Sequence, residues 1–310
     1  MVNLKETELV SVIVNCYNGE KYLEEAINSI IEQTYDNFEI IFWDNCSTDK
    51  TQNIILSYND SRIRYFRGDK NVDVYKARNY ALSKCNGNFI AFLDSDDYWY
   101  PSKLEKQIPL FDDSDVGLVF SDSYFFNEYR ILRRNYKYGY PKEKNYFSNL
   151  IVNYHLDIET VVLRKSILEK FDLKFNNEFN CVGDADLFLR VAFHSKIKIY
   201  PEILAKWRIH QESITYNQQD RFIIENKKML TDLDSYFKKN GFNYTKEINC
   251  ARKKTLNREL FSLWKKDKPG ELRSKIKKLE SYDLTVLVIF IISFFPFRLF
   301  LKIKKIFRLL

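Results

Sequence analysis

Short apolar runs separated by polar turns repeat along the first 120 residues of the chain. Residues 9–14 and 38–43 are mostly apolar without alternation, which is typical of strands buried on both faces. Apolar residues then recur at helical spacing after each run, through about Gln33, Tyr58 and Lys84. This order of strand and helix predicts an α/β protein with a doubly wound, mostly parallel sheet flanked by helices.

The most uniform apolar run, residues 89–93, ends abruptly in Asp94, Ser95, Asp96 and Asp97. Carboxylates this close repel one another, and burying them uncompensated would cost several kcal/mol each. A divalent cation solves this problem, because two carboxylates two residues apart can both reach one hard ion. A solvated acidic turn solves it equally well, and this stretch alone leaves both interpretations open.

Polar turns follow three of the predicted strands, at residues 16–19, 44–49 and 94–97. Ligands of such sheets bind beyond the carboxyl ends of the strands, so we expect the three turns to meet in one crevice. No Gly-x-Gly-x-x-Gly sequence follows a predicted strand, so the dinucleotide fingerprint is absent.

The pattern becomes less regular after Pro101. We expect a helix to about residue 110, strands at 116–120 and 158–163, a helix at 185–192 and an edge strand within 197–207. Residues 129–146 are basic and rich in tyrosine, which favours a mobile loop or an irregular segment on the acceptor side. Residues 216–283 are expected to form a helical C-terminal extension.

The end of the chain has a different composition. Residues 284–297 are mainly apolar but too few for a spanning helix, which needs roughly 20. Residues 298–310 mix apolar and basic side chains at helical spacing, as in helices that lie in a membrane interface with their cations toward anionic head groups. We therefore interpret 284–310 as a membrane-associating tail. A helix docked on the protein's own core or on a partner subunit is the alternative.

Charge and cysteine content narrow the class of protein. The net charge of +7 arises mainly from Lys and Arg beyond residue 246, which indicates a local basic surface and no nucleic-acid partner. The five cysteines show no paired spacing and indicate reduced thiols in a cytosolic protein. The first residues contain no apolar signal region, so we expect a cytoplasmic location.

Four motifs together resemble the nucleotide-sugar domain of family 2 glycosyltransferases. They are Val12-Ile-Val-Asn-Cys-Tyr-Asn-Gly-Glu20, Phe42-Trp-Asp-Asn-Cys-Ser-Thr-Asp49, Lys76-Ala-Arg-Asn79 and Phe92-Leu-Asp-Ser-Asp-Asp-Tyr-Trp99. The resemblance covers about residues 10–213 and implies the GT-A fold with inversion at the sugar carbon. Residues 1–215 would then be the catalytic domain, with a nucleotide-sugar half at about 1–122 and an acceptor half at 123–215.

By this resemblance, Asp94 and Asp96 hold Mn²⁺ or Mg²⁺ against the diphosphate of the donor. Asp96 is expected to be the direct ligand, and Asp94 to reach the ribose or, through water, the ion. Such a metal neutralises charge on the departing nucleoside diphosphate. Asp97 is left open between a share in this site and a helix cap.

The same resemblance places a nucleotide base on the first two turns. Asn15 and Tyr17 look like the uracil platform, with Tyr17 stacking on the base or simply packing. The family usually has two aspartates in the second turn, where this chain has Asp44 and Asn45. Asn45 carries both a donor and an acceptor, so it remains compatible with uridine. Arg78 is expected near the nucleotide, with an ion pair to the acidic turn as the alternative.

The segment Cys181-Val-Gly-Asp-Ala-Asp-Leu-Phe-Leu-Arg190 is similar to the family's Glu-Asp-x-Asp-Leu-x-Leu-Arg sequence. Asp184 aligns with the aspartate that takes the proton from the acceptor hydroxyl, and an inverting displacement needs one such base. From spacing alone, Asp184 would equally be a helix N-cap. The family's preceding Glu is Gly183 here, and Asp186 is expected to be structural.

A final motif, Trp207-Arg-Ile-His-Gln-Glu-Ser213, resembles the family's Arg-x-His segment. His210 is expected to reach the metal or the diphosphate, with a surface histidine as the alternative. Arg208 is expected to bind phosphate, which a guanidinium matches in a bidentate manner.

These expectations combine into one function. The sequence predicts a metal-dependent hexosyltransferase that moves a sugar from a UDP-sugar to a hydroxyl of a glycan, at the inner face of the cell membrane. The tail favours a lipid-linked acceptor, as in assembly of O-antigen, capsule, lipooligosaccharide or glycoprotein glycans. The main alternative is a degenerate domain that binds nucleotide-sugar or glycan without turnover, against which the presence of Asp94, Asp96 and Asp184 argues. A scaffold whose tail binds a partner helix is a third possibility.

Overall fold

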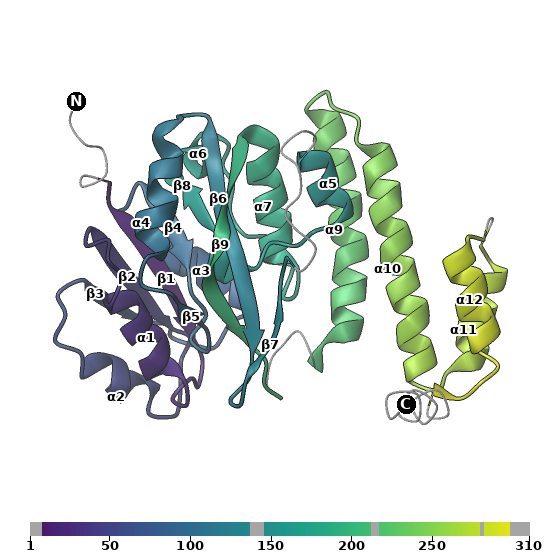
Figure 1. Ribbon diagram of the computed structural model, residues 1–310, viewed down its shortest axis with the longest axis horizontal. Coiled ribbons are helices and arrows are strands. Elements are labelled where there is room, and N and C mark those ends of the chain that lie inside the picture. Colours follow the sequence, from purple (N-terminus) through teal and green to yellow (C-terminus); the bar gives the residue numbers. More distant parts are fainter. Residues whose placement is uncertain (1–7, 137–145, 212–216, 280–281, 298–310) are drawn as a thin grey trace. The chain divides into compact units, whose positions relative to one another are not determined.

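The computed structural model describes residues 8–136, 146–211, 217–279 and 282–297 (Figure 1). The chain divides into two compact units, Met1–Ile214 and Thr215–Leu310. The first contains all of the strands among the described residues, and the second is helical.

Four parallel strands form one side of the sheet in the first unit. Across the sheet they are β3 (Ile63–Arg67), β2 (Phe38–Asp44), β1 (Val10–Cys16) and β4 (Phe89–Phe92). Every residue of β2 and β4 is buried, which explains why both are mostly apolar without alternation. The helices that connect these strands are α1 (Leu23–Ile31), α2 (Thr51–Leu56) and α3 (Val74–Leu82). The predicted alternation of strand and helix is confirmed.

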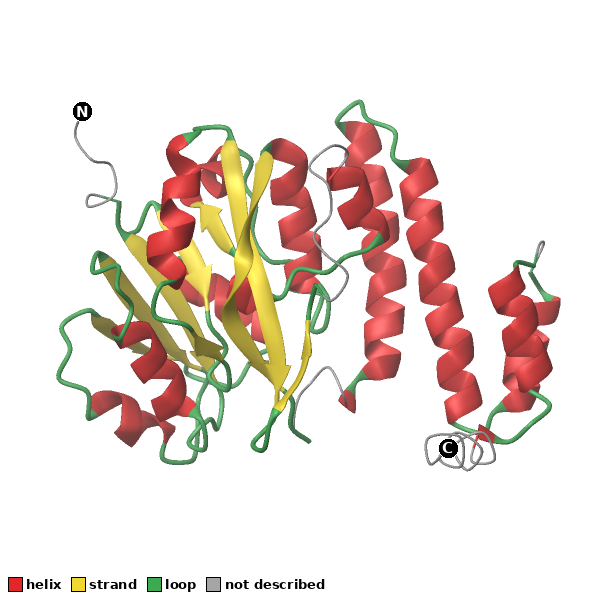
Figure 2. Cartoon of the chain, viewed as in Figure 1, coloured by secondary structure: helices red, strands yellow, loops and turns green. Residues whose placement is uncertain are grey.

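The other side of the sheet is mixed. The order continues through β8 (Val162–Arg164), β6 (Val116–Phe126), β9 (Lys196–Arg208) and β5 (Tyr98–Trp99). Strand β8 runs antiparallel to both β4 and β6, whereas β9 runs parallel to β6. Helices lie alongside the sheet (Figure 2). In this half they are α4 (Lys103–Gln107), the 3₁₀ helix η2 (Ile108–Asp112), α5 (Tyr146–Val152), α6 (Lys165–Lys170) and α7 (Gly183–His194).

Three details of the mixed half differ from the sequence predictions. Within the segment expected to be a loop, β7 (Ile131–Arg134) forms a hairpin with β6, and residues 137–145 lie outside the described residues. The predicted strand at 158–163 begins as a 3₁₀ turn, η3 (Ile158–Thr160). Strand β9 is not at the edge, because the short strand β5 pairs with its far side. The elements β7, η3 and β5 are each too short to produce a period in the sequence.

The second unit contains four described helices: α9 (Gln219–Lys239), α10 (Thr245–Lys265), α11 (Pro269–Lys277) and α12 (Leu284–Ile292). A separate apolar core joins the last three through Leu260, Trp264, Leu272, Ile276, Val286 and Ile289. No helix in the described part of the chain is long and apolar enough to cross a membrane. The residues 298–310 of the predicted tail lie outside the described residues.

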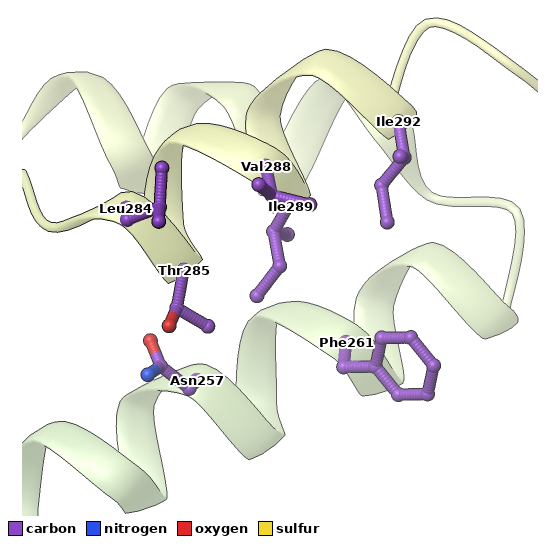
Figure 3. Close-up of a pocket in the computed structure, with 7 residues that line it drawn as sticks. All are labelled: Asn257, Phe261, Leu284, Thr285, Val288, Ile289 and Ile292. Carbon is purple, nitrogen blue, oxygen red and sulfur yellow. The ribbon is translucent and has the colours of Figure 1, made fainter.

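Helix α12 is buried along one side only. Val286 and Ile289 face the core, while Leu284, Leu287, Val288 and Ile291 are exposed. An apolar groove of about 480 Å³ lies between α10 and α12 (Figure 3). It is lined by Asn257, Phe261, Leu284, Thr285, Val288, Ile289 and Ile292. The helix is therefore part of a small packed cluster that still presents a large apolar surface.

Candidate active site

The carboxyl ends of β1, β2 and β4 meet at one edge of the sheet, because the three strands are parallel neighbours. The turns after them are in contact. The backbone N–H of Asn18 donates to Ser47 Oγ at 3.0 Å, and that of Leu93 donates to the carbonyl oxygen of Ile13 at 3.0 Å. The three polar turns therefore lie at one edge of the sheet, as predicted, and their forming a ligand crevice stays a prediction.

Asp94 stands at the end of β4 and pairs with a buried cation. Arg78 Nη2, from α3, donates to Asp94 Oδ1 at 2.5 Å. A buried guanidinium without a partner is costly, so this carboxylate stabilises Arg78 where it lies. About 34% of the Asp94 side chain remains accessible, which leaves room for a ligand on the side away from Arg78. The ion pair expected as the alternative role of Arg78 is thus present, and contact with a nucleotide stays a prediction.

Asp96 meets His210 although the two are far apart in the sequence. His210 Nε2 lies 2.7 Å from Asp96 Oδ2, and both side chains are partly accessible. The end of β9 is held in place by Arg208, whose Nε donates to the backbone oxygen of Asp96 at 2.7 Å. This contact brings the acidic turn and the Arg-x-His segment together.

The chemistry of Asp96 and His210 fits a divalent cation if a substrate supplies further ligands. No group of three His, Cys, Asp or Glu side chains within the described ranges is placed to hold an ion alone. Mg²⁺ is usually bound through one or two carboxylates together with water and substrate phosphate oxygens. Mn²⁺ also accepts carboxylate and water ligands. Asp96 and His210 therefore suit an ion that binds together with a diphosphate.

Asp97 is buried and faces away from solvent. Its Oδ1 accepts a hydrogen bond from the backbone N–H of Arg208 at 2.7 Å, while Oδ2 has no partner among the described residues. Burial, and then the neighbouring carboxylates, raise the pKa of Asp97 well above its usual range. The helix that follows begins at Lys103, after Ser102, so the interpretation of Asp97 as a helix cap is wrong. Its contact instead fixes the backbone of β9.

The side chain of Arg208 is buried and fully engaged by the protein. Its Nη2 donates to Glu25 at 2.5 Å, and the guanidinium lies 4.3 Å from the ring centroids of Tyr22 and Phe126. These contacts fix the residue beside the acidic turn. Binding of phosphate by Arg208 stays a prediction.

The side chains of Asp44 and Asn45 order the wall of the crevice. The Asp44 carboxylate accepts hydrogen bonds from Tyr65 Oη at 2.9 Å and Arg67 Nη1 at 2.7 Å. Asn45 Nδ2 donates to the Val72 carbonyl oxygen at 2.7 Å, and Asn45 Oδ1 accepts from the Val72 N–H at 3.2 Å. The side-chain nitrogen and oxygen of Asn45 thus both bind the loop that precedes α3. Direct contact of either residue with a base stays a prediction.

Unlike Asp44 and Asn45, the side chains of Asn15 and Tyr17 are not used in hydrogen bonds among the described residues, so they could contact a ligand. Both polar atoms of the Asn15 side chain are buried without a partner among the described residues. Buried polar groups are normally paired, so an unpaired donor and acceptor indicate a ligand. Tyr17 is 50% exposed, unusual for a large aromatic side chain, which suits a platform for a flat ring. These two side chains have the chemistry needed to bind a heterocyclic base.

Asp184 lies in the first turn of α7. The residue before this helix is Val182, so Asp184 is not its N-cap. Tyr75 Oη, from α3, donates to Asp184 Oδ1 at 2.7 Å. Burial raises the pKa of Asp184, and the Tyr75 hydrogen bond and the charge of Arg78 oppose that rise. A carboxylate with a raised pKa is a stronger proton acceptor than an ordinary aspartate, which suits a general base. Asp186 pairs with Arg190, which fits its expected structural role.

Residues 11–193, more than half of the chain, match the model of glycosyl transferase family 2. The chain belongs to this family. An Escherichia coli relative, UDP-Glc:alpha-D-GlcNAc-diphosphoundecaprenol beta-1,3-glucosyltransferase WfgD, is 33% identical over 214 residues, 68% of this chain and 81% of its own. The protein is therefore a glycosyltransferase.

Solved structures of other transferases share the fold. S. aureus TarS 1-349 in complex with UDP-GlcNAc superposes with a TM-score of 0.66 at 22% identity, over 81% of this chain and 72% of that one. Mannosyltransferase PcManGT from Pyrobaculum calidifontis, in complex with GDP-Man and Mn2+, has a TM-score of 0.63 at 15% identity, over 96% of this chain and 84% of that one. The predicted GT-A fold is confirmed.

Tyr154 and Asp157, two buried polar residues near Asp184, were not found from the sequence. Asp157 Oδ2 accepts hydrogen bonds from Ser123 Oγ at 2.5 Å and Asn135 Nδ2 at 2.8 Å, and burial raises the pKa of Asp157 to about 7. The hydroxyl of Tyr154 is buried without a partner among the described residues, and burial and then the charge of Asp184 raise its pKa. Their positions follow no period, so only the folded chain reveals them as neighbours.

Proposed function

We propose that this protein is an inverting, metal-dependent hexosyltransferase that moves a sugar from a UDP-sugar to a hydroxyl of a lipid-linked glycan. The observation that carries the proposal is the pair of contacts made by α3. Arg78 binds the donor-side carboxylate Asp94, and one turn earlier Tyr75 binds the candidate base Asp184. Charge for a diphosphate and a base for an acceptor are thereby held on one short helix, which positions them for a single displacement.

In the proposed reaction, the acceptor oxygen forms a bond to the anomeric carbon as the bond to the nucleoside diphosphate breaks. Asp184 takes the proton of the acceptor hydroxyl, and the attack from the opposite face inverts the sugar carbon. Asp96 and His210 would hold Mn²⁺ or Mg²⁺, which supplies positive charge for the leaving diphosphate. The nucleobase of the donor binds to Asn15 and Tyr17.

The relatives support the classes of donor and acceptor. WfgD is named for UDP-Glc as donor and for an acceptor sugar on diphosphoundecaprenol. The likeness to it supports a UDP-sugar and a lipid-linked acceptor in polysaccharide biosynthesis here. The Mn2+ in the PcManGT complex supports metal dependence. Its GDP-Man shows that this fold also takes another base, so the assignment of uridine rests on the closer relative.

The second unit supports a location at the inner face of the cell membrane. Large apolar side chains are exposed on and just after α12, at Leu284, Leu287, Val288, Ile291, Phe294 and Phe295. The groove of Figure 3 continues this apolar surface toward α10. Contiguous apolar surface of this kind marks an interaction site. Together with the basic composition of residues 298–310, it favours peripheral binding to anionic lipid.

The decisive experiment tests sugar transfer and the role of Asp184 as general base together. UDP-sugars are screened for UDP release with GlcNAc-diphosphoundecaprenol and Mn²⁺, and the product's anomeric configuration is determined. Asp184→Asn should then lower kcat by about 10²–10⁴-fold while UDP binding in calorimetry stays near normal. Loss of UDP binding would contradict Asp184 as base. Donor binding without transfer by the unmodified protein would instead favour a non-catalytic binding domain.

A further inference from the structure

The space beside Gly183 is filled by the ring of Tyr75. A β-carbon on Gly183 would lie 2.5 Å from Tyr75 Cδ2, a distance at which something must move. The backbone of Gly183 does not adopt a positive φ, so its conformation does not require glycine. The absence of a side chain at position 183 is therefore explained by Tyr75.

Tyr75 is held rigidly in that place. It is buried, and its ring stacks on Phe175 with the centroids 5.4 Å apart and 24° between the planes. The guanidinium of Arg78 lies 5.2 Å from the centroid of the Tyr75 ring. A tyrosine fixed in this way presents its hydroxyl at one point, and at that point lies Asp184 Oδ1, at 2.7 Å.

We propose that Tyr75 is a positioning residue for Asp184, and that Tyr75 and Gly183 are a matched pair. The inference rests on the proposed role of Asp184 as base. By binding Oδ1, Tyr75 fixes the orientation of the Asp184 carboxylate toward the acceptor hydroxyl. Its hydrogen bond stabilises the charged carboxylate, so Asp184 is deprotonated at a lower pH than its burial alone would allow.

The first test removes only the hydroxyl. Tyr75→Phe keeps the ring against Gly183 and Phe175, so the fold and UDP binding should be unchanged. We expect kcat to fall about 10- to 100-fold, the size of a lost hydrogen bond to a charged group, with KM for the donor unchanged. The acidic limb of the kcat/KM profile should move to higher pH, because the hydrogen bond that favours the charged carboxylate is gone.

Tyr80→Phe is the matched control, because Tyr80 lies on the same helix with its side chain 41% exposed. It should leave kcat and the pH profile unchanged. A purely structural role for Tyr75 would lower the unfolding temperature without moving the acidic limb. If Tyr75→Phe has the kcat and pH profile of the unmodified protein, the inference is wrong.

The second test examines the matched pair. Gly183→Ala should lower the unfolding temperature and kcat strongly in the unmodified protein, because the new methyl group meets the Tyr75 ring. The same change in a Tyr75→Ala background should cost much less, since the ring has gone. Equal losses in both backgrounds would overturn the pairing.

These outcomes separate the inference from the proposed function. If Asp184→Asn retains transfer, Asp184 is not the base and the proposed function is wrong at that residue. If Asp184→Asn abolishes transfer but Tyr75→Phe changes neither kcat nor the acidic limb, only the positioning role fails.

Discussion

The two units of this glycosyltransferase depart from the usual distribution of residues in opposite ways. The first unit buries charged and polar side chains, among them Arg78, Asp97 and Arg208. The second unit leaves large apolar side chains in solvent along α12. Buried polar groups and exposed apolar surfaces are the informative exceptions in a folded protein. The kind of exception in each unit therefore matches the kind of partner that we propose for it.

The two units also differ in how these unusual side chains are stabilised. In the first unit several buried charges have an oppositely charged partner from another element, such as Arg78 with Asp94 and Arg208 with Glu25. Such pairs fix geometry, as a site that must orient a donor, an acceptor and a base requires. The exposed surface of α12 contains no comparable pairing, and apolar burial is not directional. It suits a partner that has no fixed shape, such as a membrane surface.

The largest effect should come from Asp96→Asn. If the accessible carboxylates of the first unit serve a metal and a diphosphate, this change should lower transfer more than 100-fold, since a metal supplies several kcal/mol of stabilisation. It should also weaken UDP binding in the presence of Mn²⁺ while leaving binding without Mn²⁺ nearly unchanged. Calorimetry with and without the metal measures both. Equal UDP binding by both proteins with Mn²⁺ would show that Asp96 is not a ligand.

A smaller effect is expected from a charge on α12, measured as binding to lipid vesicles. Ile291→Glu places a charge on the exposed surface of α12 and should weaken binding to phosphatidylglycerol vesicles about tenfold or more, because an isoleucine gains about 1.5–3 kcal/mol on burial. Ile224→Glu on α9 is the matched control, since Ile224 is 67% exposed and Ile291 is 61% exposed. Vesicle flotation should separate the two variants. The same result for both would mean that α12 has no special part in lipid binding.

The sequence identified the crevice because its residues follow buried strands. The strands β1, β2 and β4 are continuous apolar runs, and the polar turns after them could be placed on one sheet edge by topology alone. The pairing of Asp96 with His210 spans 114 residues and produces no local pattern. Only the resemblance to known transferases brought those two positions together.

The contact of Tyr75 with the proposed base Asp184 could not be predicted from the sequence in the same way. Tyr75 lies within an ordinary helical pattern, and its partner Asp184 is 109 residues away. The sequence shows Gly183 where the resemblance leads one to expect Glu, but it gives no reason for the difference. The reason is steric, since the Tyr75 ring occupies that space, and steric exclusion between distant residues appears only in the folded chain.

The smallest effect should come from Asp97, next to the proposed metal ligand Asp96. Asp97→Asn retains an oxygen that can accept the Arg208 N–H bond, and burial, which raises the pKa of Asp97, favours an uncharged side chain at this position. Transfer should therefore change by only a few-fold, and the unfolding temperature by little. Asp97→Ala removes the acceptor and leaves a buried N–H unpaired, which should cost about 1–3 kcal/mol in the free energy of unfolding. If Asp97→Asn were as damaging as Asp96→Asn, the charge of Asp97 would be needed for the reaction, and burial in this turn could not be taken as a sign of a structural role.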